Sequence, residues 1–133
     1  MDEQGSWRMR GVRGATTVSE NHPDAIREAT RELLAEMVKR NDIHADDVAS
    51  AYFTTTPDLD AEFPAVVARR DFEWTNVALM CGHEMDVPGS LRHCLRILLH
   101  VNSQRRQDEI DFVYLRGARA LRPDLGGQDA PPK

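Results

Sequence analysis

Four arginines beside predicted strands or apolar segments are the residues of this sequence best suited to chemistry. Arg13 lies in the first predicted strand, Arg69 and Arg96 border apolar segments, and Arg122 lies near the C-terminus. A planar guanidinium binds a carboxylate through two parallel hydrogen bonds. The set therefore predicts a binding site for an anionic small molecule.

Three further side chains could complete such a site. Glu84, Cys81 and Tyr114 supply polar groups able to contact a hydroxyl, but they provide no evident general base or nucleophile. The spacing predicts a site that binds and polarises a ligand and does not attack it.

Several other kinds of site are disfavoured by spacing. Cys81, His83, Glu84 and Asp86 stand close together, but they match neither a paired C-x-x-C nor an H-E-x-x-H zinc motif. The sequence also lacks the G-x-S-x-G nucleophile elbow and the glycine spacing of a dinucleotide loop. We therefore expect neither a metal nor a cofactor.

Length and composition limit the kinds of protein this can be. The chain has 133 residues, 41% of them apolar and 29% charged, which is enough for one domain. Its net charge of -5 disfavours nucleic-acid binding, and no apolar run is long enough to span a bilayer. Met1 to Ser6 lacks the basic start and apolar stretch of a secretory signal, so we expect a cytoplasmic protein with both cysteines reduced.

The first half of the chain shows five elements. Alternation predicts a strand over 7–18, and apolar residues at helical spacing predict a helix from Pro23 to Arg40. Aromatic and β-branched residues predict a strand from Val48 to Thr56. A short helix is expected to begin near Pro64, and the apolar run Val77 to Cys81 predicts a buried strand.

The second half predicts one more helix and one more strand. Apolar residues at i, i+3, i+4, i+7 and i+8 predict a helix over 91–99, with Arg92 and Arg96 along one edge. Ile110 to Leu115 has strand composition. The fold class is therefore α+β, a single domain with one mixed sheet and two main helices packed on one face. The other face must meet another subunit, so we expect a homo-oligomer.

Five separated segments together resemble a known family. They are RGVRGATTV (10–18), TPDLDAEFPA (56–65), the C-x-x-E-M-D-V-P-G segment (81–89), L-R-x-C-L-R (91–96) and VYLRGARALRPDL (113–125). In this order they closely resemble the AroH-type monofunctional chorismate mutases. The resemblance runs from Arg10 to about Leu125. We expect a domain over 7–125, with a disordered tail at 1–6 and, from its composition, a flexible tail at 126–133.

The family resemblance implies a homotrimeric pseudo-barrel that rearranges chorismate to prephenate, toward phenylalanine and tyrosine, with no cofactor, no nucleic acid and no membrane. It implies that Arg96 contacts the ether oxygen of the breaking bond and that Glu84 and Cys81 contact the ring hydroxyl. The remaining residues that the resemblance assigns to substrate binding are Arg13 and Tyr114 at the carboxylate end, Phe63, Ala65 and Arg69 from the adjacent subunit, and Leu121 and Arg122 closing the pocket. Relatives often carry lysine where this chain has Val66.

Two other functions fit the same arginines. One is a trimeric imine or enamine deaminase of similar architecture. The other is a non-catalytic module that binds a carboxylate metabolite.

Overall fold

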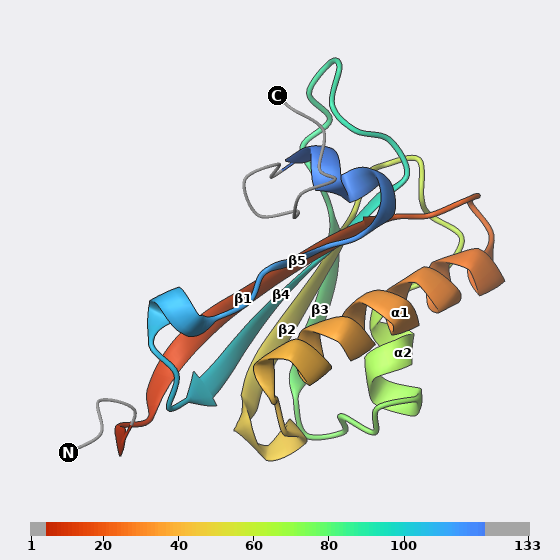
Figure 1. Cartoon of the computed structure of the whole chain (residues 1–133). Coiled ribbons are helices and arrows are strands. Elements are labelled where there is room, and N and C mark those ends of the chain that lie inside the picture. Colours follow the sequence, from red (N-terminus) through yellow and green to blue (C-terminus); the bar gives the residue numbers. More distant parts are fainter. Residues whose placement is uncertain (1–4, 122–133) are drawn as a thin grey trace.

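Strand β4 (Cys94–Ser103) is the middle strand of a five-stranded mixed sheet in the computed structural model, which describes residues 5–121 (Figure 1). On one side β4 pairs antiparallel with β1 (Arg8–Thr17), and β1 pairs parallel with the short β5 (Val113–Tyr114). On the other side β4 pairs antiparallel with β2 (Val48–Thr55), and β2 pairs parallel with β3 (Ala78–His83). The order across the sheet is β3-β2-β4-β1-β5.

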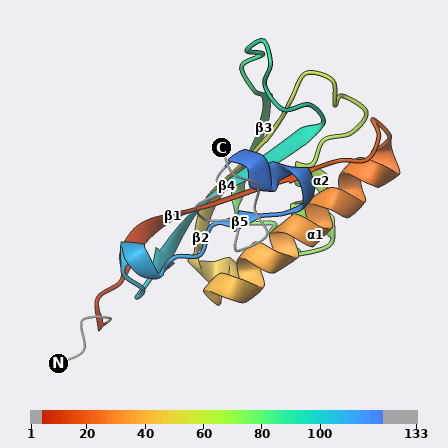
Figure 2. The ribbon, with the colours of Figure 1, turned by 45° about the horizontal axis from the view of Figure 1, so that its top comes forward.

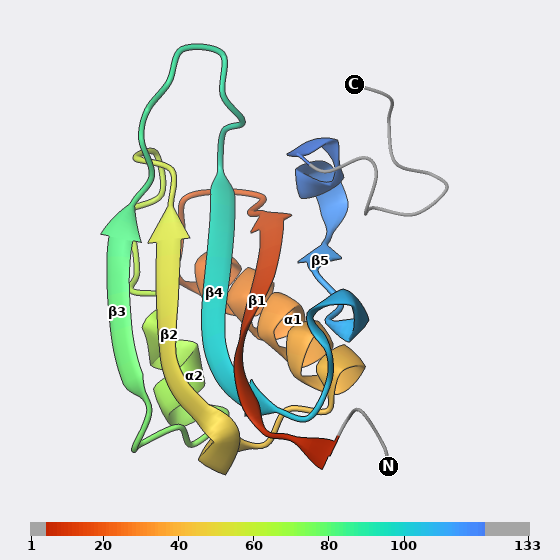
Figure 3. The same cartoon turned by 90° about the vertical axis from the view of Figure 1, so that its left-hand side faces the viewer.

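Two helices pack on the same face of this sheet. They are α1 (Pro23–Asn41) and the short α2 (Ala65–Arg70), and both lie behind the sheet in Figure 3. They stay together on one side when the molecule is turned (Figure 2). The His22 side chain accepts a hydrogen bond from the backbone N–H of Asp24 at the start of α1, and Asp42 ends it in the left-handed conformation.

The side chains of β4 alternate between the two faces. Leu95, Ile97, Leu99 and Val101 are almost fully buried in the core formed with α1, whereas the residues between them point to the opposite face. We call the face opposite α1 and α2 the open face. The 3₁₀-helix η4 (Arg116–Leu121) lies on that side, at the end of the sheet where the β3–β4 loop projects (Figure 1).

The helix predicted over 91–99 is wrong, because this segment runs into strand β4. A central strand is buried on one face and half-covered on the other, so its apolar residues need not alternate strictly. One subset of the apolar residues in this segment has helical spacing, and another subset alternates as in a strand. Pairing with β1 and β2 selects the strand. Arg92 and Arg96 therefore do not share a helix edge: Arg92 precedes the strand, and Arg96 lies within it.

The other predicted elements are present with small shifts at their ends, and the fold class is confirmed. The prediction that the strand over Val77 to Cys81 is buried is wrong, because β3 is an edge strand with no buried residue. A short apolar run therefore does not by itself identify an interior strand. The strand expected over Ile110 to Leu115 is reduced to β5 and follows the 3₁₀-helix η3 (Gln107–Glu109), while η2 (Ala45–Asp47) leads into β2. Residues 1–4 of the predicted N-terminal tail, residues 122–125 of the predicted domain and the whole predicted tail at 126–133 lie outside the described residues. Within the described residues, no helix is long and apolar enough to cross a membrane.

Gly14 lets α1 approach β1 closely. A Cβ at this position would lie 2.4 Å from Sδ of Met37 and 3.0 Å from a methyl carbon of Leu33. We expect Gly14→Ala to lower the free energy of unfolding by about 1–3 kcal/mol through overpacking, measured by denaturant unfolding. Gly11→Ala is the matched control, because its nearest contact would be 3.9 Å away. Equal stability of the two variants would contradict this packing.

Candidate active site

A row of directly paired residues crosses all five strands on the open face. Tyr114 of β5 pairs with Ala15 of β1, Ala15 with Arg96 of β4, Arg96 with Thr54 of β2, and Thr54 with Gly82 of β3. Paired residues carry their side chains on the same face, so the row forms the floor of a site. Ala15 is buried against Tyr114 and Ala118, and a Cβ at Gly82 would lie 2.8 Å from the Tyr52 hydroxyl.

Arg96 has a largely buried guanidinium in the middle of this row. Its side chain is 29% exposed, and its Nε is buried with no hydrogen-bond partner within residues 5–121. The nearest carboxylate is that of Glu84, whose Oε2 lies 3.6 Å from this Nε, beyond hydrogen-bond distance. A buried donor without a partner is costly, which indicates that a ligand completes it.

Tyr114 has a second such group at the β5 end of the row. The residue is 5% exposed, and its buried hydroxyl has no hydrogen-bond partner in the described part of the chain. It packs against Ala15 and Ala118, with Leu121 of η4 at the edge of the same cluster. Arg122 lies outside the described residues, and the role of Leu121 and Arg122 in closing the pocket stays a prediction.

Arg13 and Glu84 share a cavity with Arg96. It has a volume of about 320 Å³, and Glu84 enters it from just beyond the end of β3, where its backbone N–H donates to the carbonyl of Thr55. The structure therefore brings together three of the predicted residues from three different segments. The lining residues that the sequence analysis did not single out for the site are Tyr52, Thr54, His83, Met85, Ile97 and Leu98.

A second group of predicted residues gathers elsewhere on the chain. Cys81 pairs with the buried Phe53, so it points to the helix-covered face, away from Arg96. It lines a separate cavity of about 360 Å³ together with Phe63, whose side chain is highly exposed. Ala65 begins α2, and Arg69 is exposed at its other end. Within one chain, Cys81 is not beside Glu84 as the resemblance implied.

Burial raises the pKa of the Cys81 thiol above its usual range, while the backbone of Ala65 and the charge of Arg69 partly oppose this effect. The thiol is therefore protonated at neutral pH and can donate a hydrogen bond, but it is a weak nucleophile. Val66 follows Ala65 in α2, and its side chain is buried.

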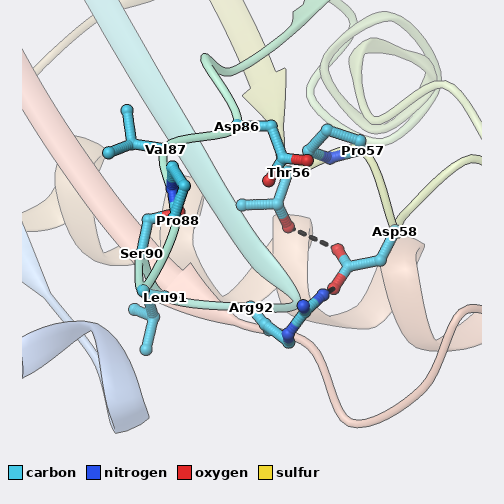
Figure 4. Close-up of a pocket in the computed structure, with 10 residues that line it drawn as sticks. Thr56, Pro57, Asp58, Asp86, Val87, Pro88, Ser90, Leu91 and Arg92 are labelled. Atoms are coloured by element: carbon cyan, nitrogen blue, oxygen red, sulfur yellow. Dashed lines mark hydrogen bonds and ion pairs between the residues drawn. The ribbon is translucent and has the colours of Figure 1, made fainter.

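Asp58 lies between β2 and α2 and fixes the end of the β3–β4 loop, just before β4 begins. Its carboxylate accepts a hydrogen bond from the Thr56 hydroxyl at 2.6 Å, and Arg92 lies 3.9 Å away (Figure 4). It also accepts a hydrogen bond from the backbone N–H of His93 at 3.1 Å. Burial opposes its ionisation, but these hydrogen bonds prevail and lower the pKa of Asp58. This contact fixes the chain just ahead of Arg96.

No group of three or more histidine, cysteine, aspartate or glutamate side chains among the described residues is arranged to hold a metal ion. The expectation that the protein needs neither metal nor cofactor stays a prediction.

These observations define a class of protein: a small α+β enzyme with a cavity built around arginines for an anionic substrate. A family model, chorismate mutase type I, matches residues 9–125. The chain is 46% identical over 118 residues to chorismate mutase AroH of Thermus thermophilus, covering 88% of this chain and 96% of that protein. It is 40% identical over 117 residues to chorismate mutase AroH of Bacillus subtilis (strain 168), covering 88% and 92%.

A solved structure shares the same fold. Chorismate mutase from Clostridium thermocellum superposes with a TM-score of 0.80 at 50% sequence identity, over 82% of this chain and 96% of that one. The chain belongs to the chorismate mutase type I family. The predicted family and the predicted chorismate mutase activity, an isomerase activity, are confirmed, and they are favoured over a deaminase or a binding module.

We expect Asp58→Ala to lower the free energy of unfolding by about 1–3 kcal/mol at neutral pH, because it removes hydrogen bonds to a charged group. The folded-state pKa of Asp58 lies below its unfolded value, so its stabilisation is present above about pH 3.9 and is lost as the pH falls through the folded-state pKa. Denaturant unfolding should therefore show that Asp58→Ala and the unchanged protein differ less in free energy of unfolding near pH 3 than near pH 7. Asp86→Ala, in the same cavity, is the control. Equal losses in the two variants would contradict the role of Asp58.

Proposed function

We propose that this enzyme converts chorismate to prephenate in one concerted step, at clefts between the subunits of a homotrimer. The observation that carries the proposal is the row on the open face, with the buried Nε of Arg96 and the buried hydroxyl of Tyr114 both lacking partners within residues 5–121. Two donors held in place before a ligand arrives suit a reaction that develops negative charge.

The rearrangement explains why the site needs no general base. One C–O bond breaks while one C–C bond forms, so no proton moves and no covalent intermediate is required. Negative charge gathers on the enolpyruvyl oxygen, where Arg96 acts, and positive charge gathers on the ring, where the carboxylate of Glu84 acts. Only interactions that are stronger in the transition state than in the ground state raise the rate.

The size of the rate acceleration requires several groups to act together. An acceleration of about 10⁶ needs about 8 kcal/mol. One preorganised donor to developing charge contributes about 2.7–4 kcal/mol, so Arg96 cannot supply the whole effect. We assign the rest to binding the folded-over conformer of chorismate through its two carboxylates, with Arg13 and Tyr114 at one end.

The split of the predicted residues between two faces supports a site built from two chains. Arg96, Glu84, Arg13 and Tyr114 belong to the open face, whereas the second group lies on α2, just before it, and on the helix-covered side of β3. We propose that Phe63, Ala65, Arg69 and Cys81 of a neighbouring subunit form the opposite wall. Leu121 and Arg122 then close the pocket. This places Cys81 in the opposite wall, whereas the sequence analysis grouped it with Glu84.

The apolar surface of the open face supports the trimer. Met80 is 66% exposed and Tyr52 is 39% exposed, and both line a shallow apolar hollow with Leu98. Such a patch is typical of a surface that another chain covers. Three copies joined by one repeated contact would give three equivalent clefts. We also propose that the enzyme is cytoplasmic and serves phenylalanine and tyrosine biosynthesis.

We expect Arg96→Ala to lower kcat by about 10²–10³-fold or more, because it removes the donor to the ether oxygen. Arg96→Lys should also be slow, since a point charge does not reproduce the planar fork of the guanidinium. The loss of chorismate ultraviolet absorbance measures both rates. Arg92→Ala is the control, because its side chain is 85% exposed and precedes the strand. Turnover by Arg96→Ala at the rate of the unchanged enzyme would refute the assignment.

Hybrid trimers test the two-chain cleft. We expect inactive Arg96→Ala chains mixed with inactive Phe63→Ala or Arg69→Ala chains to regain partial activity, because some clefts then combine two intact walls. Each variant alone, taken through the same unfolding and reassembly, is the control. Mixed trimers that form, as mass spectrometry can verify, yet stay inactive would place the whole site within one subunit.

A further inference from the structure

The opposite charges of Glu84 and Arg96 lie close together in this structure, but the two side chains do not hydrogen-bond to each other. Both side chains are mostly buried, with exposed fractions of 24% and 29%, and they carry opposite charges. A carboxylate and a guanidinium so placed normally close to about 2.7–2.9 Å and form charge-assisted hydrogen bonds. Here Oε2 of Glu84 stays 3.6 Å from Nε of Arg96.

The hydroxyl of Thr54 is the group that competes for the carboxylate. It donates a hydrogen bond to Oε2 of Glu84, the same oxygen that faces Arg96. Strand register fixes this contact, because Thr54 and Arg96 are direct partners on β2 and β4 and share the open face. The backbone N–H of Glu84 is also fixed, since it donates to the carbonyl of Thr55 at 2.8 Å.

We propose that Thr54 is a positioning residue for the rearrangement: its hydroxyl holds the Glu84 carboxylate off Arg96, so that Nε of Arg96 remains available to the substrate. The inference rests on the proposed roles of Arg96 and Glu84. Thr54 itself does not touch the reacting atoms. It acts by keeping two opposite charges close enough to serve one transition state but too far apart to neutralise each other.

Loss of the hydroxyl lets the pair close. The carboxylate then hydrogen-bonds to Nε of Arg96, and the reacting ether oxygen has to displace it as negative charge develops. Binding of the substrate carboxylates depends on other groups, Arg13 and Tyr114 among them. We therefore expect removal of the hydroxyl to lower kcat and to leave KM nearly unchanged. A general disturbance of the fold would not produce this pattern.

Steady-state kinetics of a small set of variants tests the proposal. Thr54→Val keeps the shape and the β-branch but removes the hydroxyl, and we expect kcat to fall by about tenfold to a hundredfold with KM changed by less than about twofold. Thr54→Ser should restore most of kcat, whereas Thr54→Ala should not. If the valine variant folds poorly, the serine and alanine variants still isolate the hydroxyl, because both lack the methyl group.

Ser50→Ala is the matched control. Ser50 lies on the same strand and the same face as Thr54, and its hydroxyl hydrogen-bonds to His100 on β4 at 2.9 Å, away from Glu84. Its kcat should equal that of the unchanged enzyme. A loss in Ser50→Ala as large as in Thr54→Val would show that any hydroxyl bridging β2 and β4 matters, and would overturn the proposal.

The double variant Thr54→Val with Glu84→Gln separates this proposal from the function on which it rests. If Thr54 acts through the Glu84 charge, the double variant should be no slower than Glu84→Gln alone. If the losses of kcat in the two single variants add up in the double variant, the positioning role of Thr54 is overturned. The same holds if Thr54→Val keeps its kcat while Glu84→Gln lowers it. A Glu84→Gln enzyme as fast as the unchanged one would instead refute the proposed role of Glu84, and the positioning role with it.

Discussion

The pairing of β4 with strands on both sides is the constraint on which the rest of the structure depends. It aligns Tyr114, Ala15, Arg96 and Thr54 across the sheet, and alternation sends all four to the face opposite α1. A one-residue slip of β4 would bury Arg96 against the core and expose Ile97. The core residues of β4 therefore specify the register, and the register places the guanidinium. Stability and site geometry are set by the same hydrogen bonds.

The same sheet also explains why one chain holds only part of the proposed site. Helices α1 and α2 bury one face, and Phe63 and Cys81, which we propose for the opposite wall, lie on that side or at its edge. The open face carries the charged floor and exposed apolar side chains. An assembly that covers the apolar part of this face would bring a second chain to its charged part. In this account oligomerisation and catalysis use neighbouring parts of one surface.

How far the sequence predicts this structure depends on whether a segment has a single interpretation. Helix α1 was predictable because its apolar spacing, Pro23 near its start and its basic last turn all agree. Strand β4 was not, because its apolar residues fit two periods and only long-range pairing selects one. Arg96 was identified from the family motif even though its element was wrong. Thr54 was missed because its role depends on strand register, which one sequence does not reveal, and the face of Cys81 was missed for the same reason.

The central claim is that the guanidinium of Arg96, which finds no hydrogen-bond acceptor at Nε within residues 5–121, waits for the ether oxygen of the substrate. A crystal structure with a rigid bicyclic dicarboxylate that carries this ether oxygen, as a mimic of the transition state, tests it most directly. The account predicts the ether oxygen about 3 Å from Nε or a terminal nitrogen of Arg96, with Phe63 of a neighbouring subunit against the ring. A mimic bound elsewhere, or bound here with Arg96 paired to Glu84 and turned away from the ether oxygen, would contradict it.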